Sequence, residues 1–313
     1  MEFVRPSGTY QLDGTLLGSG TYGQVFAATW ARPSSAAPTQ VALKRFQPSD
    51  EGVDATTMRE VSHLRTLCHR NIVSCLDVFV DQDAVWLVMP RCECDLIRFS
   101  MKFAGRRIPA AQTVRLFGGL VEGVAYMHDR CLLHRDLKPG NLLIGPDRVL
   151  KIADLGLSRR VMSAADRVLT PDVCTVWYRA PEILFGRRYT DSADMWSVGC
   201  ILAEMEAGRA LFRGDDELQV VKSIVGCLGC TDDESDLAAL LDDEAHPFAP
   251  LLKTSGTCHA QKSTQKKSQT PFRDFAHADM LAKLLKYNPT TRISARSAAA
   301  TPQRPKRKRT ELE

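Results

Sequence analysis

The run His134–Asn141 (HRDLKPGN) gathers three chemically active side chains within eight residues. Asp136 supplies a carboxylate that can accept the proton of a hydroxyl group as that oxygen reacts. Lys138 supplies a positive charge that can neutralise a phosphate group in transfer, and Asn141 supplies an amide oxygen that can hold Mg²⁺. These residue types in this order favour a site that moves a phosphate group.

A glycine-rich segment, Gly18–Val25 (GSGTYGQV), lies between the apolar Leu16–Leu17 and a strand-like stretch. Glycines at this spacing let a hairpin backbone approach phosphate oxygens, because no Cβ stands between the amide groups and the anion. Taken alone, the segment is equally consistent with a simple glycine-rich hairpin.

Lys44 ends the apolar run Val41–Lys44, which reads as the next strand. An ammonium group that emerges from such a strand is costly to bury without a partner, so it calls for a carboxylate and an anionic ligand. Glu60, on the helix predicted next, is the natural carboxylate. The alternative is that both residues are ordinary surface charges.

Together, these residues resemble the protein kinases. In that family a metal-binding aspartate follows a short strand, and here Leu150–Ala153 leads into Asp154–Gly156 (DLG). A chance match would require every one of these groups to occur in the same order. The resemblance implies transfer of the γ-phosphate of ATP, and Lys138 is typical of the serine/threonine kinases rather than the tyrosine kinases.

The resemblance also implies which residues act. It gives Asn141 and Asp154 as Mg²⁺ ligands. It gives catalytic roles to Lys44, Glu60, Asp136, Lys138 and Thr175. It gives ATP contacts to Leu17, Gly18, Ser19, Gly20, Thr21, Tyr22, Gly23, Gln24, Val25, Ala42, Lys44, Met89, Pro90, Cys92, Asp95 and Leu143.

Leu155 stands where the family usually has phenylalanine. An apolar residue at this position can still pack beneath the helix that bears Glu60, so activity is expected, with a shifted balance between active and inactive forms. The resemblance implies a packed column of Leu64, Cys75, His134 and Leu155.

The segment Trp177–Glu182 (WYRAPE) is similar to that of the cyclin-dependent and mitogen-activated kinases. In those families the arginine, here Arg179, occupies a carbonyl just before it, which corresponds to the region of Cys174. The amide after the phosphorylated residue then lacks an acceptor, and proline, which has no amide hydrogen, is favoured. The resemblance therefore implies substrates of Ser-Pro or Thr-Pro type.

The same segment lacks the Thr-x-Tyr pair of the mitogen-activated kinases, and Thr170 stands where cyclin-dependent kinases are phosphorylated. A phosphate at that position attracts arginines, and Arg59, Arg135 and Arg159 match the three that the family uses.

Two further features resemble the cyclin-dependent kinases. Thr21 and Tyr22 match an inhibitory phosphorylation pair, whose added charge repels the phosphates of ATP. Thr56–Glu60 (TTMRE) is similar in form to a cyclin-binding helix, which implies a cyclin or cyclin-like partner. WYRAPEILFG and the basic ending KRKRTELE are similar to the kinases that activate cyclin-dependent kinases.

The chain reads as a strand-rich front and a helical back, which predicts an α+β, two-lobed kinase fold. Strands are expected within 10–46 and at 85–89, and helices near 54–68, from 109, at 191–207 and at 215–228. The first helix is expected to bury a stripe of Val61, Leu64 and Cys68.

The kinase domain is expected at 10–296, with a small lobe at about 10–90 and a large lobe at about 95–296. Residues 231–271 read as a divergent, partly disordered surface insert, and 297–313 as a basic, disordered tail. Near the end, Arg292 is expected to pair with Glu182 and brace the segment before it.

Composition is that of an ordinary globular protein, with 44% hydrophobic and 25% charged residues. No run approaches the roughly 20 apolar residues of a membrane helix, and the start lacks a secretory signal, so a nuclear or cytoplasmic protein is expected. The ten cysteines fit reduced thiols, and the close pairs Cys92/Cys94 and Cys227/Cys230 are interpreted as packing residues rather than metal ligands. The tail RPKRKR suits either a solvated end or a nuclear import signal.

Three functions stay open on this basis. The first is an active cyclin-dependent-like kinase. The second is a catalytically weak, kinase-like scaffold that binds nucleotide and a cyclin, which Leu155 and the divergent rear suggest. The third, nucleic-acid binding through the tail, has less support because the net charge is only +4.

Overall fold

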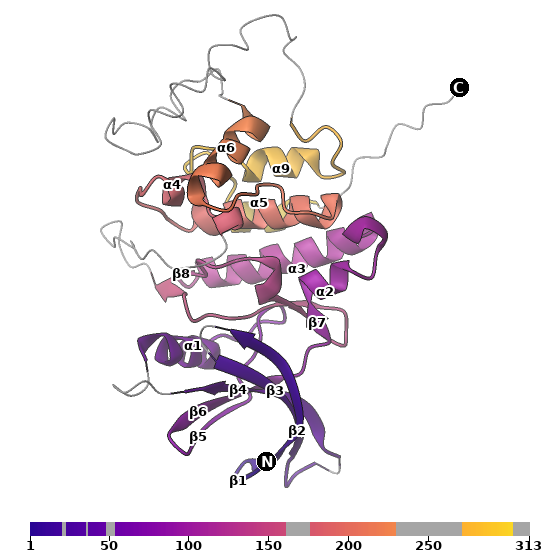
Figure 1. Cartoon of the computed structure of the whole chain (residues 1–313), viewed down its shortest axis with the longest axis vertical. Coiled ribbons are helices and arrows are strands. Elements are labelled where there is room, and N and C mark those ends of the chain that lie inside the picture. Colours follow the sequence, from indigo (N-terminus) through magenta and orange to yellow (C-terminus); the bar gives the residue numbers. More distant parts are fainter. Residues whose placement is uncertain (21–22, 36, 48–53, 161–175, 230–270, 303–313) are drawn as a thin grey trace, which may run out of the picture. The chain divides into compact units, whose positions relative to one another are not determined.

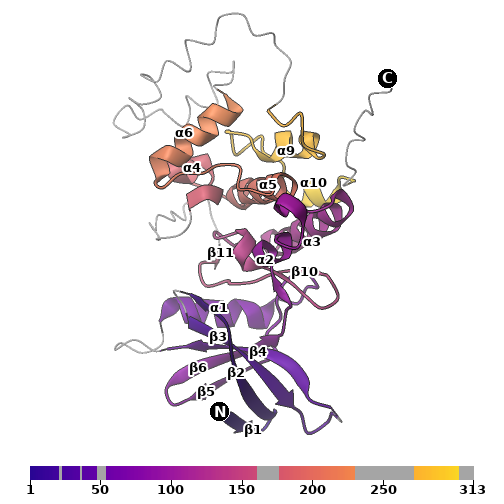
Figure 2. The same ribbon diagram turned by 45° about the vertical axis from the view of Figure 1, so that its right-hand side comes forward.

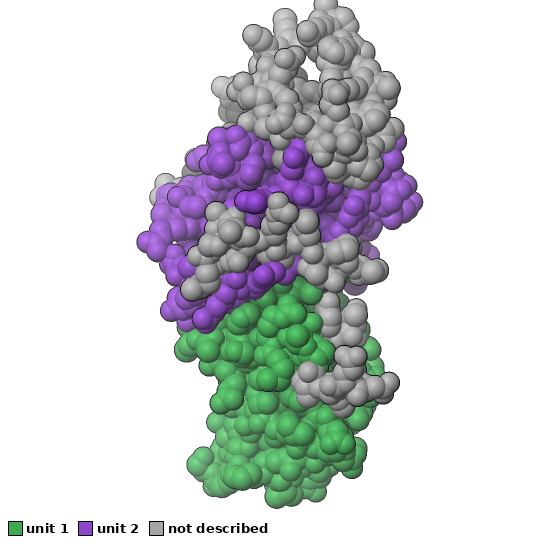
Figure 3. Space-filling view, turned by 90° about the vertical axis from the view of Figure 1, so that its left-hand side faces the viewer, with its two compact units in different colours: residues 1–99, 140–158 green, residues 100–139, 159–313 purple. Residues whose placement is uncertain are grey.

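The computed structural model describes the whole chain except residues 21–22, 36, 48–53, 161–175, 230–270 and 303–313 (Figure 1). The chain divides into two compact units, which Figure 3 colours separately. Unit 1 comprises Met1–Phe99 and Gly140–Ser158, and unit 2 comprises Ser100–Pro139 and Arg159–Glu313. Each unit is described by itself.

Unit 1 is built on a six-stranded antiparallel sheet with strand order β1-β2-β3-β4-β6-β5. The strands are β1 (Glu2–Arg5), β2 (Gly8–Gly20), β3 (Gly23–Ala31), β4 (Thr39–Phe46), β5 (Asp77–Asp81) and β6 (Ala84–Pro90). Figures 1 and 2 show the sheet strongly curved, with helix α1 (Ala55–Thr66) beside β3 and β4.

Strand β1 begins before the first strand that the sequence predicts. Phe3 inserts into the sheet core, with its ring 5.2 Å from that of Phe79 and 4.8 Å from that of Trp86. Arg5 donates to the carbonyl of Val80 at 3.2 Å and pairs with Asp81 at 2.6 Å, so the two edge strands β1 and β5 are bridged. This bridge satisfies polar groups that an open edge would expose.

Helix α1 begins at an N-cap, since Asp54 accepts hydrogen bonds from the amides of Thr56 and Thr57 at 2.7 and 2.8 Å. Its buried face consists of Thr57, Glu60, His63 and Leu64. The predicted stripe of Val61, Leu64 and Cys68 is therefore wrong in two of its three members. Cys68 lies beyond the last helical turn and is exposed, and polar interactions turn Glu60 and His63 inward instead of Val61.

A smaller sheet completes unit 1, with strand order β10-β9-β7. Its strands are β7 (Cys94–Asp95), β9 (Leu142–Ile144) and β10 (Leu150–Ile152). The short helix α2 (Leu96–Ser100) follows β7, and the 3-10 turn η2 (Pro139–Asn141) precedes β9.

Unit 2 is mainly helical. Its helices are α3 (Ala110–His128), α4 (Pro181–Leu184), α5 (Ser192–Ala207), α6 (Glu217–Leu228), α9 (Ala278–Leu284) and α10 (Ala295–Ala300). Its remaining elements are the 3-10 turns η1 (Ala104–Arg106) and η3 (Val176–Tyr178) and the paired short strands β8 (Leu132–Leu133) and β11 (Arg159–Arg160). Helix α5 is buried along most of its length because α3 and α9 pack against it, while α10 packs against α3.

The predicted α+β class is confirmed, and helices occur where the sequence predicts them near 54–68, from 109, at 191–207 and at 215–228. The predicted insert at 231–271 falls mostly outside the described residues. The predicted disordered tail at 297–313 is wrong at its start, because residues 297–300 belong to helix α10, where the Ser294 side chain caps the helix; residues 303–313 lie outside the described part. Within the described part of the chain, no helix combines the length and apolar character needed to cross a membrane.

Candidate active site

The side chains of Lys44, Glu60 and Asp154 form a charged cluster in unit 1. Lys44 Nζ, on β4, donates to Glu60 Oε1 and Oε2 on α1 at 2.7 Å each, and lies 3.3 Å from Asp154 Oδ1. Glu60 is 1% exposed and Asp154 31% exposed. The predicted partnership of Lys44 and Glu60 is therefore confirmed, and three acceptors match the three hydrogens of the ammonium group.

Burial and charge oppose one another in this cluster. Burial by itself lowers the pKa of Lys44, but the negative charges of Glu60 and Asp154 outweigh burial and raise it above its ordinary value. Burial also favours a higher pKa for Glu60. We take the pair as ionised, because Lys44 donates to both oxygens, which leaves no room for a carboxyl proton between them.

The β9–β10 hairpin brings the two predicted metal ligands to one end. Leu142 pairs with Ile152, so Asn141 directly precedes one strand while Asp154 follows the other, and the Ala153 amide donates to the Asn141 carbonyl at 2.9 Å. Asp154 has φ 62°, a value that few residues other than glycine adopt. Such a backbone at a half-buried carboxylate is typical of a functional position.

This donor set fits Mg²⁺. Magnesium prefers oxygen ligands and is usually held by one or two protein groups, with water and substrate phosphates as the rest. Asn141 and Asp154 supply such oxygens, whereas the described residues contain no cluster of three or more His, Cys, Asp or Glu side chains that suits a metal held by protein alone.

The glycine-rich segment is the hairpin between β2 and β3. Gly18 faces Val25, Ser19 faces Gln24 and Gly20 faces Gly23, while Thr21 and Tyr22 lie outside the described part. Gly23 has φ 144°, and a Cβ there would lie 2.3 Å from the Arg45 carbonyl oxygen on β4. Only glycine therefore fits at this position.

Strand pairing places other predicted ATP contacts beside one another in unit 1. Val25 pairs with Lys44, Ala42 with Met89, and Asp95 with Leu143. Leu17 is half-buried on β2.

Two residues after the end of β6, Cys92 contributes a partly buried thiol. Cys92 Sγ lies 4.0 Å from the Pro90 carbonyl oxygen, and burial raises the Cys92 pKa to about 11. This thiol is protonated at neutral pH.

Unit 2 carries its own set of predicted catalytic residues. Lys138 Nζ lies 2.7 Å from Asp136 Oδ2, and both side chains are partly exposed. Asp194, at the start of α5, accepts hydrogen bonds from the amides of His134 and Arg135 at 2.9 Å each. Arg135 has φ 71°, so the chain bends sharply just before Asp136.

Asp194 is a functional residue that sequence reasoning missed. Burial alone raises its pKa, but hydrogen bonding and charge from His128, together with the His134 amide, lower it below its ordinary value. The available signal was a lone carboxylate within the otherwise apolar stretch ADMWSVGCIL.

Comparison with known proteins matches the "Protein kinase domain" family over residues 12–303. The chain is 37% identical to the "Cell division control protein 2 homolog 3" of Trypanosoma brucei brucei, over 92% of this chain and 89% of the relative. It is 37% and 38% identical to the "Cyclin-dependent kinase B2-1" and "B2-2" of Arabidopsis thaliana, over 91% of this chain and 90% of each relative. The chain belongs to the cyclin-dependent kinase family. It is an ATP-dependent serine/threonine protein kinase, as its motifs predict.

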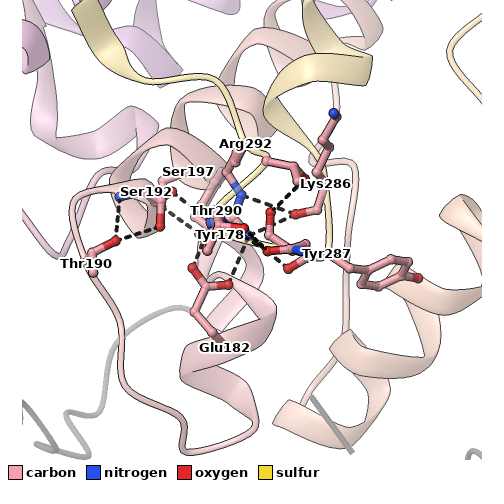
Figure 4. Close-up of polar contacts among 11 residues, drawn as sticks. Tyr178, Glu182, Thr190, Ser192, Ser197, Lys286, Tyr287, Thr290 and Arg292 are labelled. Atoms are coloured by element: carbon pink, nitrogen blue, oxygen red, sulfur yellow. Dashed lines mark hydrogen bonds and ion pairs between the residues drawn. The ribbon is translucent and has the colours of Figure 1, made fainter. Parts of the chain in front are cut away.

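Helix α4 of this kinase carries one partner of a buried ion pair, and the predicted pairing of Arg292 with Glu182 is confirmed. Arg292 donates to both carboxylate oxygens of Glu182, at 2.7 and 2.9 Å, and to the carbonyls of Ser192, Lys286 and Tyr287 (Figure 4). Neither side chain of the pair is more than 1% exposed. Every charge buried here therefore has a partner.

Arg179 of the kinase donates to Glu217 Oε1 at 2.8 Å, at the start of α6. Trp177 Nε1 donates to the Gly214 carbonyl at 2.7 Å. These contacts hold the segment from η3 to α4 against the start of α6. The carbonyl that Arg179 is predicted to occupy belongs to the region of Cys174, which lies outside the described residues.

The three predicted phosphate-binding arginines are placed in both units. Arg59, in unit 1, donates through Nε to the Ala55 carbonyl at 3.1 Å. In unit 2, the Arg135 guanidinium lies 6.0 Å from the Tyr189 ring, and Arg159 is exposed on β11.

Other regulatory predictions for the kinase stay untested by its described residues. Thr170 and Thr175 lie outside them. The predicted column stays a prediction, although Leu64 and Leu155 are buried in unit 1 and His134 is buried in unit 2.

Proposed function

We propose that this kinase phosphorylates serine or threonine followed by proline, under control of a cyclin-like activator, in cell-cycle or transcription control. In the transfer step, the substrate hydroxyl oxygen bonds to the γ-phosphorus of ATP while the bond from that phosphorus to the β-γ bridging oxygen breaks. The hydroxyl proton passes to Asp136, and ADP leaves.

The observation that carries this proposal is the cluster of Lys44, Glu60 and Asp154. Lys44 is buried, charged and held by two carboxylates, which is the arrangement of a cation that positions an anionic ligand. Lys44 would orient the ATP phosphates, while Lys138, beside Asp136, would neutralise the γ-phosphate.

Asn141 and Asp154 would hold Mg²⁺, as their shared hairpin end supports. The ion would supply positive charge to the triphosphate. The β2–β3 hairpin would cover the phosphates, and the residues from Met89 to Asp95, with Ala42 and Leu143, would surround the adenine and ribose. Thr175 would assist near the substrate, as in the family.

Proline-directed specificity is supported by the fixed position of Arg179. Its guanidinium is only 19% exposed and is held by Glu217. When this guanidinium donates a hydrogen bond to the carbonyl just before it in the chain, that carbonyl can no longer accept from the substrate. The amide of the substrate residue after the phosphorylated serine or threonine then has no acceptor. Proline has no such amide hydrogen and therefore loses nothing.

A cyclin-like activator is supported by the outer surface of α1. Met58 is 59% exposed on the helix whose opposite face carries Glu60. An apolar side chain displayed beside the charged Arg59 offers a partner both packing and charge. Binding there would act directly on the helix that places Glu60 against Lys44.

Phosphorylation would regulate the enzyme in two ways. A phosphate on Thr170 would attract the guanidinium groups of Arg59, Arg135 and Arg159. Phosphates on Thr21 and Tyr22 would repel ATP. The basic run at 304–309 would serve nuclear import, with both nucleus and cytoplasm as sites of action.

The alternative function is a weak kinase that serves as a nucleotide- and cyclin-binding scaffold. The observation in its favour is Leu155 in place of phenylalanine. Leu155 is nevertheless fully buried, so the smaller side chain still packs. ATP binding without phosphate transfer, even with an activator present, would favour this alternative.

The test uses two peptides that differ only in Ser-Pro against Ser-Ala. With Mg²⁺ and co-purified activator, we expect phosphate transfer to Ser-Pro at least about tenfold faster. Asp136→Asn should lower kcat by about 10²–10⁴-fold, since it removes the proton acceptor. Asp129→Asn, at a 43% exposed site, is the matched control. Equal rates on both peptides would reject the specificity, and full activity of Asp136→Asn would reject the mechanism.

A second test addresses the activator surface. Met58→Glu should reduce stimulation by the co-purified cyclin-like protein about tenfold while basal transfer persists, because a charge replaces the apolar contact. Met101→Glu, at a 54% exposed site in unit 2, should leave stimulation unchanged. Unaltered stimulation of Met58→Glu would place the activator elsewhere.

A further inference from the structure

Helix α1 carries a buried histidine that the mechanism above does not use. His63 follows Glu60 by three residues, on the same buried face of the helix. Its Nδ1 atom lies 2.7 Å from Ser158 Oγ. The two residues are 9% and 0% exposed, so the contact is shielded from water.

The direction of the hydrogen bond follows from counting protons. Ser158 Oγ also lies 2.5 Å from the Leu155 carbonyl oxygen, which can only accept. The hydroxyl group has one hydrogen, so it donates to Leu155 and accepts from His63. His63 therefore carries its hydrogen on Nδ1, and a directed chain runs from α1 through Ser158 to the Leu155 backbone.

The end of this chain adjoins a proposed metal ligand. Leu155 directly follows Asp154, whose backbone adopts the uncommon φ of 62°. The Ser158 amide donates to the same Leu155 carbonyl at 3.0 Å, so the turn from 155 to 158 is closed by two bonds from one residue. This turn fixes the direction in which the chain leaves Asp154.

Helix α1 is thus tied to the segment 154–158 at two places. The first tie is charged and runs from Glu60 through Lys44 to Asp154. The second is the neutral chain from His63. Helix α1 also packs tightly against this segment, since a Cβ at Gly156 would lie 2.9 Å from Thr56 Cγ2.

Movement of α1 away from this segment would break the second tie inside the protein. It would break the buried hydrogen bond between His63 Nδ1 and Ser158 Oγ, and the loss of a buried hydrogen bond costs free energy. The chain therefore stabilises the helix position in which Glu60 reaches Lys44.

We propose that His63 and Ser158 are positioning residues that latch α1 to the Asp154 segment and so hold Lys44, Glu60 and Asp154 in register for phosphate transfer. This inference rests on the proposed roles of those three residues. The latch holds the Leu155 backbone through a hydrogen bond, so it does not depend on the size of the Leu155 side chain.

The test compares four variants in purified kinase with activator and Mg²⁺. Ser158→Ala and His63→Leu each break the chain while retaining most of the packing, and each should lower kcat about tenfold. His63→Asn keeps a donor at the δ position and should recover at least half of the activity. The kcat of the double variant His63→Leu/Ser158→Ala should be no lower than that of the less active single variant, because either substitution alone already breaks the hydrogen-bond chain.

Readings taken well below the unfolding temperature separate positioning from stability. Ser62→Ala, on the exposed face of α1, is the matched control and should keep wild-type kcat. Wild-type kcat in Ser158→Ala and His63→Leu, with only a lower Tm, would overturn the inference. Equal loss in His63→Asn and His63→Leu would also overturn it.

Failure of the latch is distinguishable from failure of the proposed function. If the wild type transfers phosphate and Asp136→Asn does not, the function stands whatever the latch variants do. A folded wild type without transfer would reject the function itself, and ADP-induced stabilisation of the four variants would then report the latch alone. In that assay Ser158→Ala and His63→Leu should show a smaller thermal shift than wild type, and equal shifts would reject the latch.

Discussion

The carboxylate of Asp194 accepts a hydrogen bond from the backbone amide of His134 at 2.9 Å, across sixty positions of sequence. The neighbouring amide of Arg135 makes the same contact with the other carboxylate oxygen. One buried side chain thereby fixes the backbone that leads into Asp136, so the position of the proposed proton acceptor depends on Asp194.

This relationship predicts how stability depends on pH. The pKa of Asp194 is lowered in the folded protein, so its contribution is present above the unfolded pKa of about 3.9 and is lost as pH falls through the lower, folded value. Asp194→Asn should lower the free energy of unfolding at pH 7 by about 1–3 kcal/mol, since an amide cannot replace the charged acceptor. The difference from wild type should shrink below about pH 4. Denaturant unfolding across pH 3–7 measures this, with Asp147→Asn, at an exposed position, as control. A constant difference at every pH would contradict the prediction.

The buried pair of Arg292 and Glu182 predicts a large loss of stability when one partner is removed. Arg292→Leu leaves Glu182 charged and without its partner, which should cost about 3–5 kcal/mol. Arg296→Leu removes an exposed pair with Asp129 and should cause no measurable change in Tm. Similar Tm values for both variants would show that the brace contributes little.

Phe3 predicts that the first strand is part of the folded core. Phe3→Ala should lower the free energy of unfolding by about 3–5 kcal/mol, because the ring leaves a cavity beside Phe79 and Trp86. Val4→Ala, at a 72% exposed position of the same strand, should change it by less than about 0.5 kcal/mol. Urea unfolding distinguishes the two, and equal small effects would mean that β1 is dispensable.

We expect the substitution Glu60→Gln to shift the alkaline limb of the pH–rate profile. In the wild type, Glu60 and Asp154 raise the pKa of Lys44 against the effect of burial, so the ammonium form persists above pH of about 10.4. Removing one charge lets burial lower that pKa, and activity should decline at a lower pH than in wild type. At pH 7.5 kcat should fall about tenfold or more. Glu122→Gln, exposed on α3, is the control, and an unshifted alkaline limb would contradict the account.

The parts of the site that sequence predicts are those in which charge and spacing leave few choices. A lysine at the end of a buried strand needs a carboxylate, and Glu60 supplies it. At Gly23 a Cβ would collide with the Arg45 carbonyl oxygen, so the close packing of the hairpin requires glycine there. The glycine pattern in the sequence therefore predicts the hairpin. The pairing of Arg292 with Glu182 follows from the family resemblance.

The parts that sequence missed depend on contacts between distant positions. The hydrophobic period of α1 predicts that Val61 and Cys68 are buried, yet the helix turns toward partners for Glu60 and His63, which no local pattern reveals. Asp194 meets amides sixty positions away, and β1 is too short for a strand prediction.

The central claim is that Asp154 holds the metal that phosphate transfer requires. The most direct measurement compares Mg²⁺-dependent ATP affinity and γ-phosphate transfer in wild type, Asp154→Asn and the control Asp147→Asn, which alters an exposed carboxylate in the turn of the same hairpin. We predict that Asp154→Asn abolishes both the gain in affinity from Mg²⁺ and the transfer, while Asp147→Asn retains both. A fully active Asp154→Asn, or one whose affinity for ATP still rises with Mg²⁺ as in the wild type, would contradict the account.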